Sequence, residues 1–342
     1  MANILHIAAH LGDGAGKAIS GLAILGSREG GHSHRILLLQ EPRKLNHIER
    51  CKANGVAVLP LSAIDGALAW ADIAVISYWA SAFLNDFIRG LTINKPLLIW
   101  YHNNGFSGEL MPDDVLDKCE RLLVTTPATL GISRYAAKNP APVYGFGDFN
   151  PGELTRKTDY SLKSGALSIG YVGMPTYKRL PSNFVDYCDA ALGTVPNSHF
   201  TMLGENDGSV QNDIARRGMG RYFTFIGWRN NVYDNLRRFD VFSYLMRPDT
   251  TASIDNSALE AMAVGLPVVI SQSPIGCWIV QNGATGLTVN NPQEYASAIR
   301  RLFDSEAERR RLGQAARRYA ISHCSAVENL RRFNAEIERV AK

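Results

Sequence analysis

The chain alternates from end to end between short apolar runs and longer segments in which apolar and polar positions follow a helical period. In the first half the apolar runs cover residues 3–9, 34–40, 56–61, 73–78, 96–102, 121–126 and 142–146. Most are apolar at consecutive positions, as expected for parallel strands that helices cover on both faces. This pattern predicts an open α/β domain with a parallel sheet.

The same pattern begins again after residues 147–166, a polar and glycine-containing segment that we interpret as a linker. Its strand-like runs cover residues 167–173, 199–204, 222–227, 241–246 and 266–271. The clearest helix begins at Pro292 and carries an apolar stripe to Phe303, and two arginine-rich helices follow over 305–320 and 325–341.

The predicted architecture is two Rossmann-like, doubly wound parallel-sheet domains that face each other across a cleft. We expect a first domain over 1–155 and a second over 156–325. A terminal helix over 326–342 is expected to pack back on the first domain. Ligands of such sheets bind at the carboxyl ends of the strands, so the cleft is the expected site.

Composition restricts the class of protein. The 342 residues are 46% hydrophobic and 20% charged, with a net charge of +4, which is typical of a soluble globular protein and too mild to indicate nucleic-acid binding. The five cysteines are scattered, which argues against a disulfide framework or a zinc site. The N-terminus lacks signal-peptide features, and no apolar run reaches membrane-spanning length. We therefore expect a cytoplasmic protein, at most peripheral to a membrane.

The stretch LGDGAGKAISGLA, residues 11–23, looks like a phosphate-binding loop but fits neither common motif. A P-loop requires glycine where Leu11 stands and a hydroxyl where Ala18 stands. A dinucleotide-binding G-x-G-x-x-G requires glycine where Lys17 stands, which argues against an oxidoreductase. The turn still lies between a strand and a helix, where anions are favoured. Its glycines could equally serve turn geometry alone.

The segment 250–271 is the most informative. A polar turn leads into the short helix SALEAMAV, and Gly265 ends it before a buried strand. The free N–H groups around Ser257, Ala258 and Leu259 could hold a diphosphate, and Glu260 could accept hydrogen bonds from ribose hydroxyls. The alternative is structural, because Ser257 and Glu260 also form an S-x-x-E capping box.

ALEAMAVGLPVVIS resembles the donor-site helix and strand of retaining glycosyltransferases with the GT-B fold, particularly family 4. The resemblance extends over 167–330 and, more weakly, over 1–150. It implies a nucleotide-sugar donor whose ribose is bound by Glu260, while His102 lies near the donor sugar. It further implies that backbone groups contact the diphosphate or sugar at Gly14, Ala15 and Gly16, and the base at Gly227, Trp228 and Arg229. From the residues alone, His102 could instead be a core histidine bonded to backbone.

Two departures from the family pattern stand out. Ala252 replaces a glutamate that contacts the donor sugar, and Met174 replaces the arginine of G-R-x-x-x-x-K. Lys178 or Arg179 then supplies the cation that stabilises the leaving diphosphate, although both could be ordinary solvated charges. Asp255 is our candidate to take over the sugar contacts.

The resemblance therefore implies transfer of a sugar to a glycan or lipid-linked acceptor, with retention of configuration. The chain contains no D-x-D, so we expect no metal and no other cofactor. An inactive nucleotide-sugar-binding protein or partner subunit is the alternative. The basic segment 41–52 could lie on anionic lipid or be a solvated helix face. The sequence leaves open the donor sugar, base, acceptor, linkage and oligomeric state.

Overall fold

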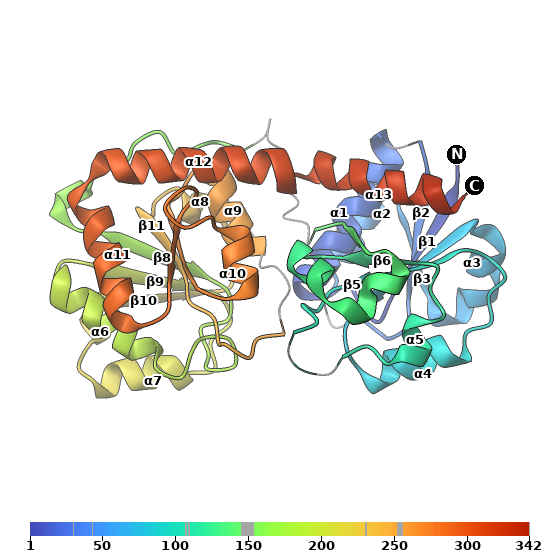
Figure 1. The fold of residues 1–342 in the computed structure, drawn as a ribbon, viewed down its shortest axis with the longest axis horizontal. Helices are drawn as coiled ribbons and strands as arrows, with labels where there is room; N and C mark the ends of the chain where they lie inside the picture. The colour runs from blue at the N-terminus through green and yellow to red at the C-terminus, as the bar shows by residue number, and fades with distance from the viewer. Residues whose placement is uncertain are drawn as a thin grey trace. The chain divides into compact units, whose positions relative to one another are not determined.

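The computed structural model describes residues 1–29, 31–42, 44–106, 108, 110–144, 154–229, 231–251 and 256–341. The chain divides into two compact units, both visible in Figure 1. The first unit comprises Met1–Asn150, Thr251–Asn256 and His323–Lys342, and the second comprises Pro151–Thr250 and Ser257–Ser322. Each unit is a parallel sheet covered by helices.

The first unit is built on a seven-stranded parallel sheet. In spatial order its strands are β3 (Ala57–Pro60), β2 (Ser33–Leu38), β1 (Asn3–Ala8), β4 (Ile73–Tyr78), β5 (Leu97–Tyr101), β6 (Arg121–Val124) and β7 (Ala141–Pro142). The central strands β4 and β5 are buried at every position, because helices cover both faces of the sheet. The consecutive apolar runs of the sequence are thus explained.

The helices of the first unit are α1 (Asp13–Glu29), α2 (Asn46–Ala53), α3 (Ile64–Trp70), α4 (Ala82–Gly90), α5 (Asp113–Leu116) and α13 (Ala326–Val340). Helix α13 comes from the end of the chain and lies beside α1 (Figure 1). Its Leu330, Phe333 and Ile337 belong to the same apolar cluster as Ile4 and Trp100. The C-terminal helix is therefore part of the core of the first unit.

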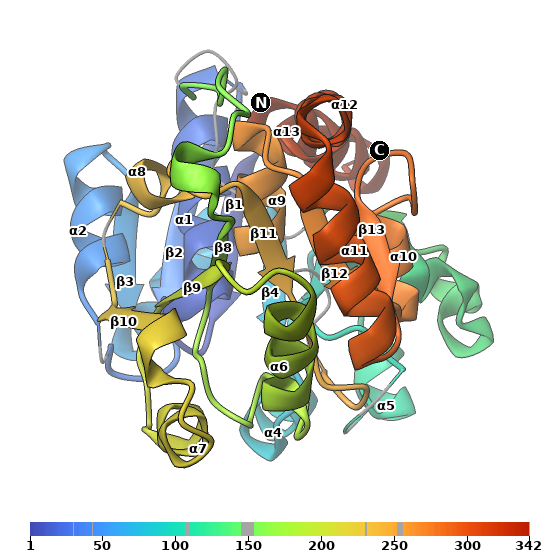
Figure 2. The ribbon, with the colours of Figure 1, turned by 90° about the vertical axis from the view of Figure 1, so that its left-hand side faces the viewer.

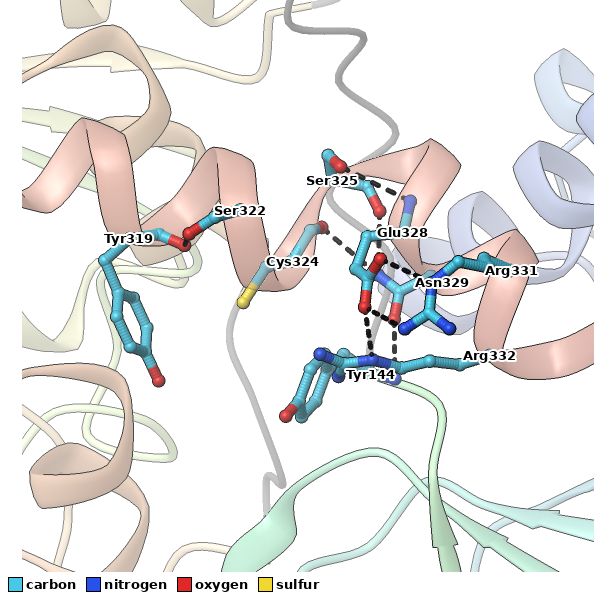
Figure 3. A network of polar contacts seen from close by, with 9 residues as sticks. All are labelled: Tyr144, Tyr319, Ser322, Cys324, Ser325, Glu328, Asn329, Arg331 and Arg332. Carbon is cyan, nitrogen blue, oxygen red and sulfur yellow. Dashed lines mark hydrogen bonds and ion pairs between the residues drawn. The ribbon is translucent and has the colours of Figure 1, made fainter. Parts of the chain in front are cut away.

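Polar contacts fix α13 in register. The Arg121 Nε donates to Glu336 Oε2 at 2.5 Å, and both side chains are buried. At the beginning of α13, Asn329 Oδ1 accepts from the backbone N of Tyr144 at 3.0 Å, and its Nδ2 donates to the carbonyls of Cys324 and Ser325 (Figure 3). These bonds join the end of the chain to β6 and to the residues after β7.

The second unit is built on a six-stranded parallel sheet. In spatial order its strands are β10 (Phe223–Gly227), β9 (His199–Leu203), β8 (Ser168–Val172), β11 (Val241–Tyr244), β12 (Val268–Ser271) and β13 (Leu287–Val289). Its helices are α6 (Phe184–Thr194), α7 (Ser209–Arg216), α8 (Tyr233–Leu236), α9 (Asn256–Val264), α10 (Pro274–Ile279), α11 (Pro292–Asp304) and α12 (Glu306–Cys324).

Helices α6 and α11 lie side by side on one face of the second sheet (Figure 2). Helix α11 begins as its sequence predicts, since Asn291 caps it by accepting from the Glu294 N and Pro292 takes the first position. The two sheets confirm the predicted fold class of paired α/β parallel-sheet domains. Among the described helices, none combines the length and the apolar character that a bilayer span requires.

Candidate active site

The order in which the chain adds strands to the second sheet reverses between β8 and β11, and we call this place the switch point of the sheet. From β8 the chain builds outward through β9 and β10, and from β11 it builds the other way through β12 and β13. The crevice outside the carboxyl ends of two such strands is the usual ligand site of an open α/β sheet. The residues after β8 and β11, together with the start of α9, are therefore the candidate site.

Glycines lie at the carboxyl ends of three neighbouring strands of this sheet: Gly173 directly follows β8, Gly204 directly follows β9, and Gly227 is the last residue of β10. Gly204 donates its N–H to the Gly227 carbonyl at 3.0 Å, and a Cβ atom on Gly204 would lie 1.8 Å from the Gly173 oxygen. Gly204 has a φ of +137° and Gly227 a φ of +64°, which favour glycine. All three glycines are partly exposed, and none of them covers the backbone at the carboxyl ends of the strands with a side chain. Our sequence analysis missed Gly173 and Gly204, although each ends a predicted strand.

The loop after β8 is held in one conformation. Thr176 N and Tyr171 OH both donate to the Met174 carbonyl, at 2.9 and 3.2 Å. The backbone N of Arg247, in the segment after β11, donates to the Arg179 carbonyl at 3.0 Å. The two sides of the switch point are therefore joined directly by backbone.

The two candidate cations differ in their surroundings. Arg179 is partly buried, and no described residue contacts its guanidinium by a hydrogen bond or ion pair. Lys178 is exposed and lies near Asp207, whose carboxyl pKa is lowered first by hydrogen bonds from Ser209 and also by the Lys178 charge. Arg179 is the more available of the two for an anion.

Helix α9 begins at Asn256, one residue earlier than the capping box requires. Ser257 therefore lies inside the described helix, and Asp255 and Ala252 lie outside the described residues. Ala258 and Leu259 are buried, and Glu260 is only 3% exposed. An anionic side chain with this burial needs partners, so Glu260 is a constrained group rather than a solvated charge.

The remaining second-unit candidates follow β10. Gly227 ends this strand, and the next two side chains turn outward, with Trp228 51% exposed and the Arg229 Nη1 donating to the Trp228 carbonyl at 2.9 Å. The backbone that follows β10 therefore begins at the last of the three glycines, Gly227.

In the first unit, α1 begins at Asp13, so Gly14, Ala15 and Gly16 form its first turn rather than a loop before it. A Cβ atom on Gly16 would lie 2.4 Å from the Leu11 carbonyl carbon, which explains the glycine there. The Nδ2 of Asn256, which is counted in the first unit, donates to the Gly14 carbonyl at 3.4 Å.

His102 directly follows β5 and is held by aromatic packing. Its ring centroid lies 4.8 Å from that of Trp100 and 6.3 Å from that of Trp79. Its Nε2 is buried and has no hydrogen-bond partner among the described residues. Burial lowers the pKa of His102 to about 3, so its imidazole is neutral near pH 7.

Comparisons with known proteins show what the two units resemble. Residues 166–305 match the family model of glycosyl transferases group 1. The lipopolysaccharide core biosynthesis glycosyltransferase LpsE of Rhizobium meliloti is 26% identical over 130 residues, which is 36% of this chain and 37% of that protein. The match thus spans little more than a third of this relative.

Solved structures match over nearly the whole chain. HepE of Anabaena in complex with UDP has a TM-score of 0.77 at 13% identity and covers 98% of this chain and 100% of its own. A glycosyltransferase from Rickettsia africae has a TM-score of 0.77 at 14% identity, covering 100% and 99%. The chain therefore has the GT-B fold of these structures, and the part that matches the glycosyl transferases group 1 model, residues 166–305, lies in its second unit.

Proposed function

We propose that this protein is a glycosyltransferase that moves a sugar from a nucleoside-diphosphate sugar to a glycan or lipid-linked acceptor. The observation that carries the proposal is the switch point of the second sheet. Gly173, Gly204 and Gly227 lie at the carboxyl ends of β8, β9 and β10, Arg179 follows β8 with no side-chain partner among the described residues, and α9 follows β11. These features lie in the domain that matches the glycosyltransferase family model. Open backbone, a helix N-terminus and a cation are all suited to a diphosphate.

The leaving group gains negative charge as the bond to the sugar breaks. In our proposal Arg179 and the α9 N–H groups at Ser257, Ala258 and Leu259 stabilise that charge, with Lys178 as a second cation. The loop after β8 supports this role, because the bond between Arg247 N and the Arg179 carbonyl fixes the cation's backbone in advance.

In our proposal the nucleoside binds at the carboxyl ends of the same strands. Glu260 accepts hydrogen bonds from the ribose hydroxyls, and the backbone of Gly227, Trp228 and Arg229 contacts the base. Gly14, Ala15 and Gly16 contribute backbone toward the donor, and His102 acts on the donor sugar as a neutral hydrogen-bonding group. Asp255 remains a proposed sugar contact.

We propose that transfer proceeds with retention and without a metal ion, since the cation and the helix dipole supply the positive charge that a metal would supply. HepE, whose fold this chain shares, binds UDP, which makes UDP the first probe to test as the donor's leaving group. LpsE, a lipopolysaccharide core enzyme by name, is consistent with a glycan or lipid-linked acceptor in polysaccharide biosynthesis. Such an acceptor fits a cytoplasmic enzyme with peripheral contact to the inner membrane face, and segment 41–52 is its candidate contact.

The test is a thermal-unfolding screen with UDP, GDP, ADP, CDP and dTDP on the full chain. A nucleotide that binds the native state at a hundred times its Kd stabilises it by about 2.7 kcal/mol, which raises Tm measurably. We expect one of the five to do so, and Glu260→Ala to remove the effect. Glu306→Gln is the matched control, because Glu306 forms an exposed pair with Arg310 in α12.

Catalysis is tested with the sugar donor of the nucleotide that binds. Release of that nucleoside diphosphate, unchanged by EDTA and lost in Arg179→Ala, is the expected result. Binding without release in the presence of candidate acceptors would favour the alternative, a nucleotide-sugar-binding protein. Strict dependence on magnesium would contradict the metal-free mechanism.

A further inference from the structure

The first sheet has its own switch point, where His10 and Trp79 have no role in the proposed donor site. From β1 the chain builds outward through β2 and β3, and from β4 it builds the other way to β7. His10 follows β1, and Trp79 follows β4 directly. Their ring centroids lie 5.2 Å apart with the planes tilted by 50°. An aromatic pair therefore lies where open α/β sheets usually bind a ligand.

Both rings present nitrogen atoms that no described residue uses. Trp79 is only partly buried, and its indole N–H donates to no described residue, whereas the Nε1 of the fully buried Trp100 donates to the Val143 carbonyl at 2.9 Å. The His10 Nδ1 accepts from the backbone N of Gly12 at 3.0 Å. In neutral His10 the proton must then lie on Nε2, which has no partner among the described residues.

His102 adds a third nitrogen of this kind. Its ring meets Trp79 edge-on, and its Nε2 is buried without a partner in the described part of the chain. A buried polar atom without a hydrogen bond costs free energy that a bound ligand can restore. Trp79 thus lies between two imidazoles, and all three side chains retain hydrogen-bonding capacity that the described residues leave unused.

We propose that the aromatic corner formed by His10 and Trp79 binds a pyranose ring of the acceptor, beside His102, which keeps its proposed role toward the donor sugar. The inference rests on the proposed function and names the substrate class of its acceptor side. A pyranose has an apolar C–H face and a rim of hydroxyl groups, which match an aromatic surface surrounded by N–H groups. The corner offers rings and N–H donors rather than paired cations, which favours a sugar hydroxyl over a phosphate group.

The experiment labels the full chain with 5-fluorotryptophan and follows the five tryptophan resonances by ¹⁹F NMR. Trp79→Phe assigns the Trp79 signal by its disappearance. Methyl glycosides of glucose, galactose, mannose and N-acetylglucosamine are the probes, titrated with and without UDP. We expect at least one to shift the Trp79 signal saturably, and His10→Ala to weaken that binding about tenfold, as the loss of one hydrogen bond predicts.

Trp70→Phe is the control, since Trp70 ends α3 at the opposite edge of the sheet and stacks with Arg35 at 4.0 Å. It should leave the glycoside affinity unchanged. If no glycoside shifts the Trp79 signal while UDP still stabilises the chain, the acceptor corner is wrong and the proposed function stands. A glycoside response that His10→Ala leaves unaltered would also overturn it. Failure of every nucleotide to bind, with the Trp79 response intact, would contradict only the proposed function.

Discussion

Gly204 and Gly173 touch through their backbones at the carboxyl ends of β9 and β8. A Cβ atom on Gly204 would lie 1.8 Å from the Gly173 oxygen, and the φ of +137° is itself unfavourable for other residues. We therefore expect Gly204→Ala to displace the loop after β8, destabilise the second unit by about 1–3 kcal/mol and abolish stabilisation by the nucleotide found in the screen. Thermal unfolding with and without that nucleotide measures both effects.

Gly193→Ala is the matched control for this substitution. Gly193 lies in α6, and a Cβ atom there would have no atom of the described residues within 4 Å. Alanine should therefore be tolerated and gain up to about 1 kcal/mol from its helix propensity. Nucleotide binding in Gly204→Ala equal to that of the control would show that the three glycines are not part of the donor site.

Arg179 should matter more than Lys178 for the rate of transfer. Its guanidinium has no partner among the described residues, whereas Lys178 is exposed and lies near Asp207. We expect Arg179→Ala to lower kcat by about 10²–10³, the usual loss for one electrostatic group at a developing charge, and Lys178→Ala to have a much smaller effect. Arg179→Lys should recover part of the loss. Steady-state kinetics with the identified donor would test this, with Arg221→Ala at the amino end of β10 as control.

The sequence predicted the fold well because its signals are local. Consecutive apolar runs mark buried parallel strands, and Asn291 with Pro292 marks the beginning of α11. The fold class is confirmed by both sheets and by the structural neighbours. The beginning of α9 was harder to predict, because Ser257 and Glu260 fit a capping box, whereas Ser257 lies inside the described helix.

The site residues remain predictions, and several of the features around them depend on distant contacts. The closeness of Gly204 to Gly173 requires β8 and β9 to pair. The His10–Trp79 contact joins the loop after β1 to the loop after β4. Hydrophobic periodicity carries no information on which loops meet at a switch point. A search for glycines at the ends of consecutive predicted strands would have found Gly173 and Gly204.

The buried ion pair between Arg121 and Glu336 should control how firmly α13 is held. Both side chains are about nine-tenths buried, so removing one charge leaves the other without compensation. We expect Glu336→Ala to destabilise the first unit by about 3–5 kcal/mol and to increase hydrogen exchange throughout α13. Asp304→Ala, which breaks the exposed pair with Arg300, should cost less than about 1 kcal/mol. Similar exchange in both variants would contradict this role.

A pair of buried histidines should make the first unit sensitive to acid. The His6 Nε2 and His34 Nδ1 lie 2.9 Å apart in a hydrogen bond, and Phe333 of α13 stacks on His6 at 5.8 Å. Burial, with the charge of His34 as a smaller cause, holds the pKa of His6 well below 6.5. Burial and then His32 lower the pKa of His34 to about 4. Both imidazoles are neutral in the folded chain at pH 7.

Because the unfolded chain binds these protons near pH 6.5 and the folded chain does not, the free energy of unfolding should fall as pH decreases from about 6.5 to 4. Each unit of pKa difference contributes about 1.4 kcal/mol. Urea unfolding of the 5-fluorotryptophan-labelled chain measures this loss of stability, followed at the ¹⁹F signal that Trp100→Phe assigns to Trp100. The double variant His6→Leu, His34→Leu should flatten the profile in this range, and an unaltered slope would show that other groups cause it.

Met174 stands where the family pattern has an arginine, so a substitution there tests whether this lost positive charge limits the rate of transfer. Met174 is 40% exposed, and the hydrogen bonds that hold this position, from Thr176 N and Tyr171 OH, go to its carbonyl oxygen. Met174→Arg can therefore restore the arginine of the family pattern without disturbing the loop. If charge at the leaving diphosphate limits the rate, kcat should rise by up to about tenfold and should partly compensate Arg179→Ala in the double variant. Met174→Gln, similar in size but uncharged, should do neither. A rate increase that glutamine reproduces would assign the effect to packing, and no change with arginine would place this position outside the reach of the transferred charge.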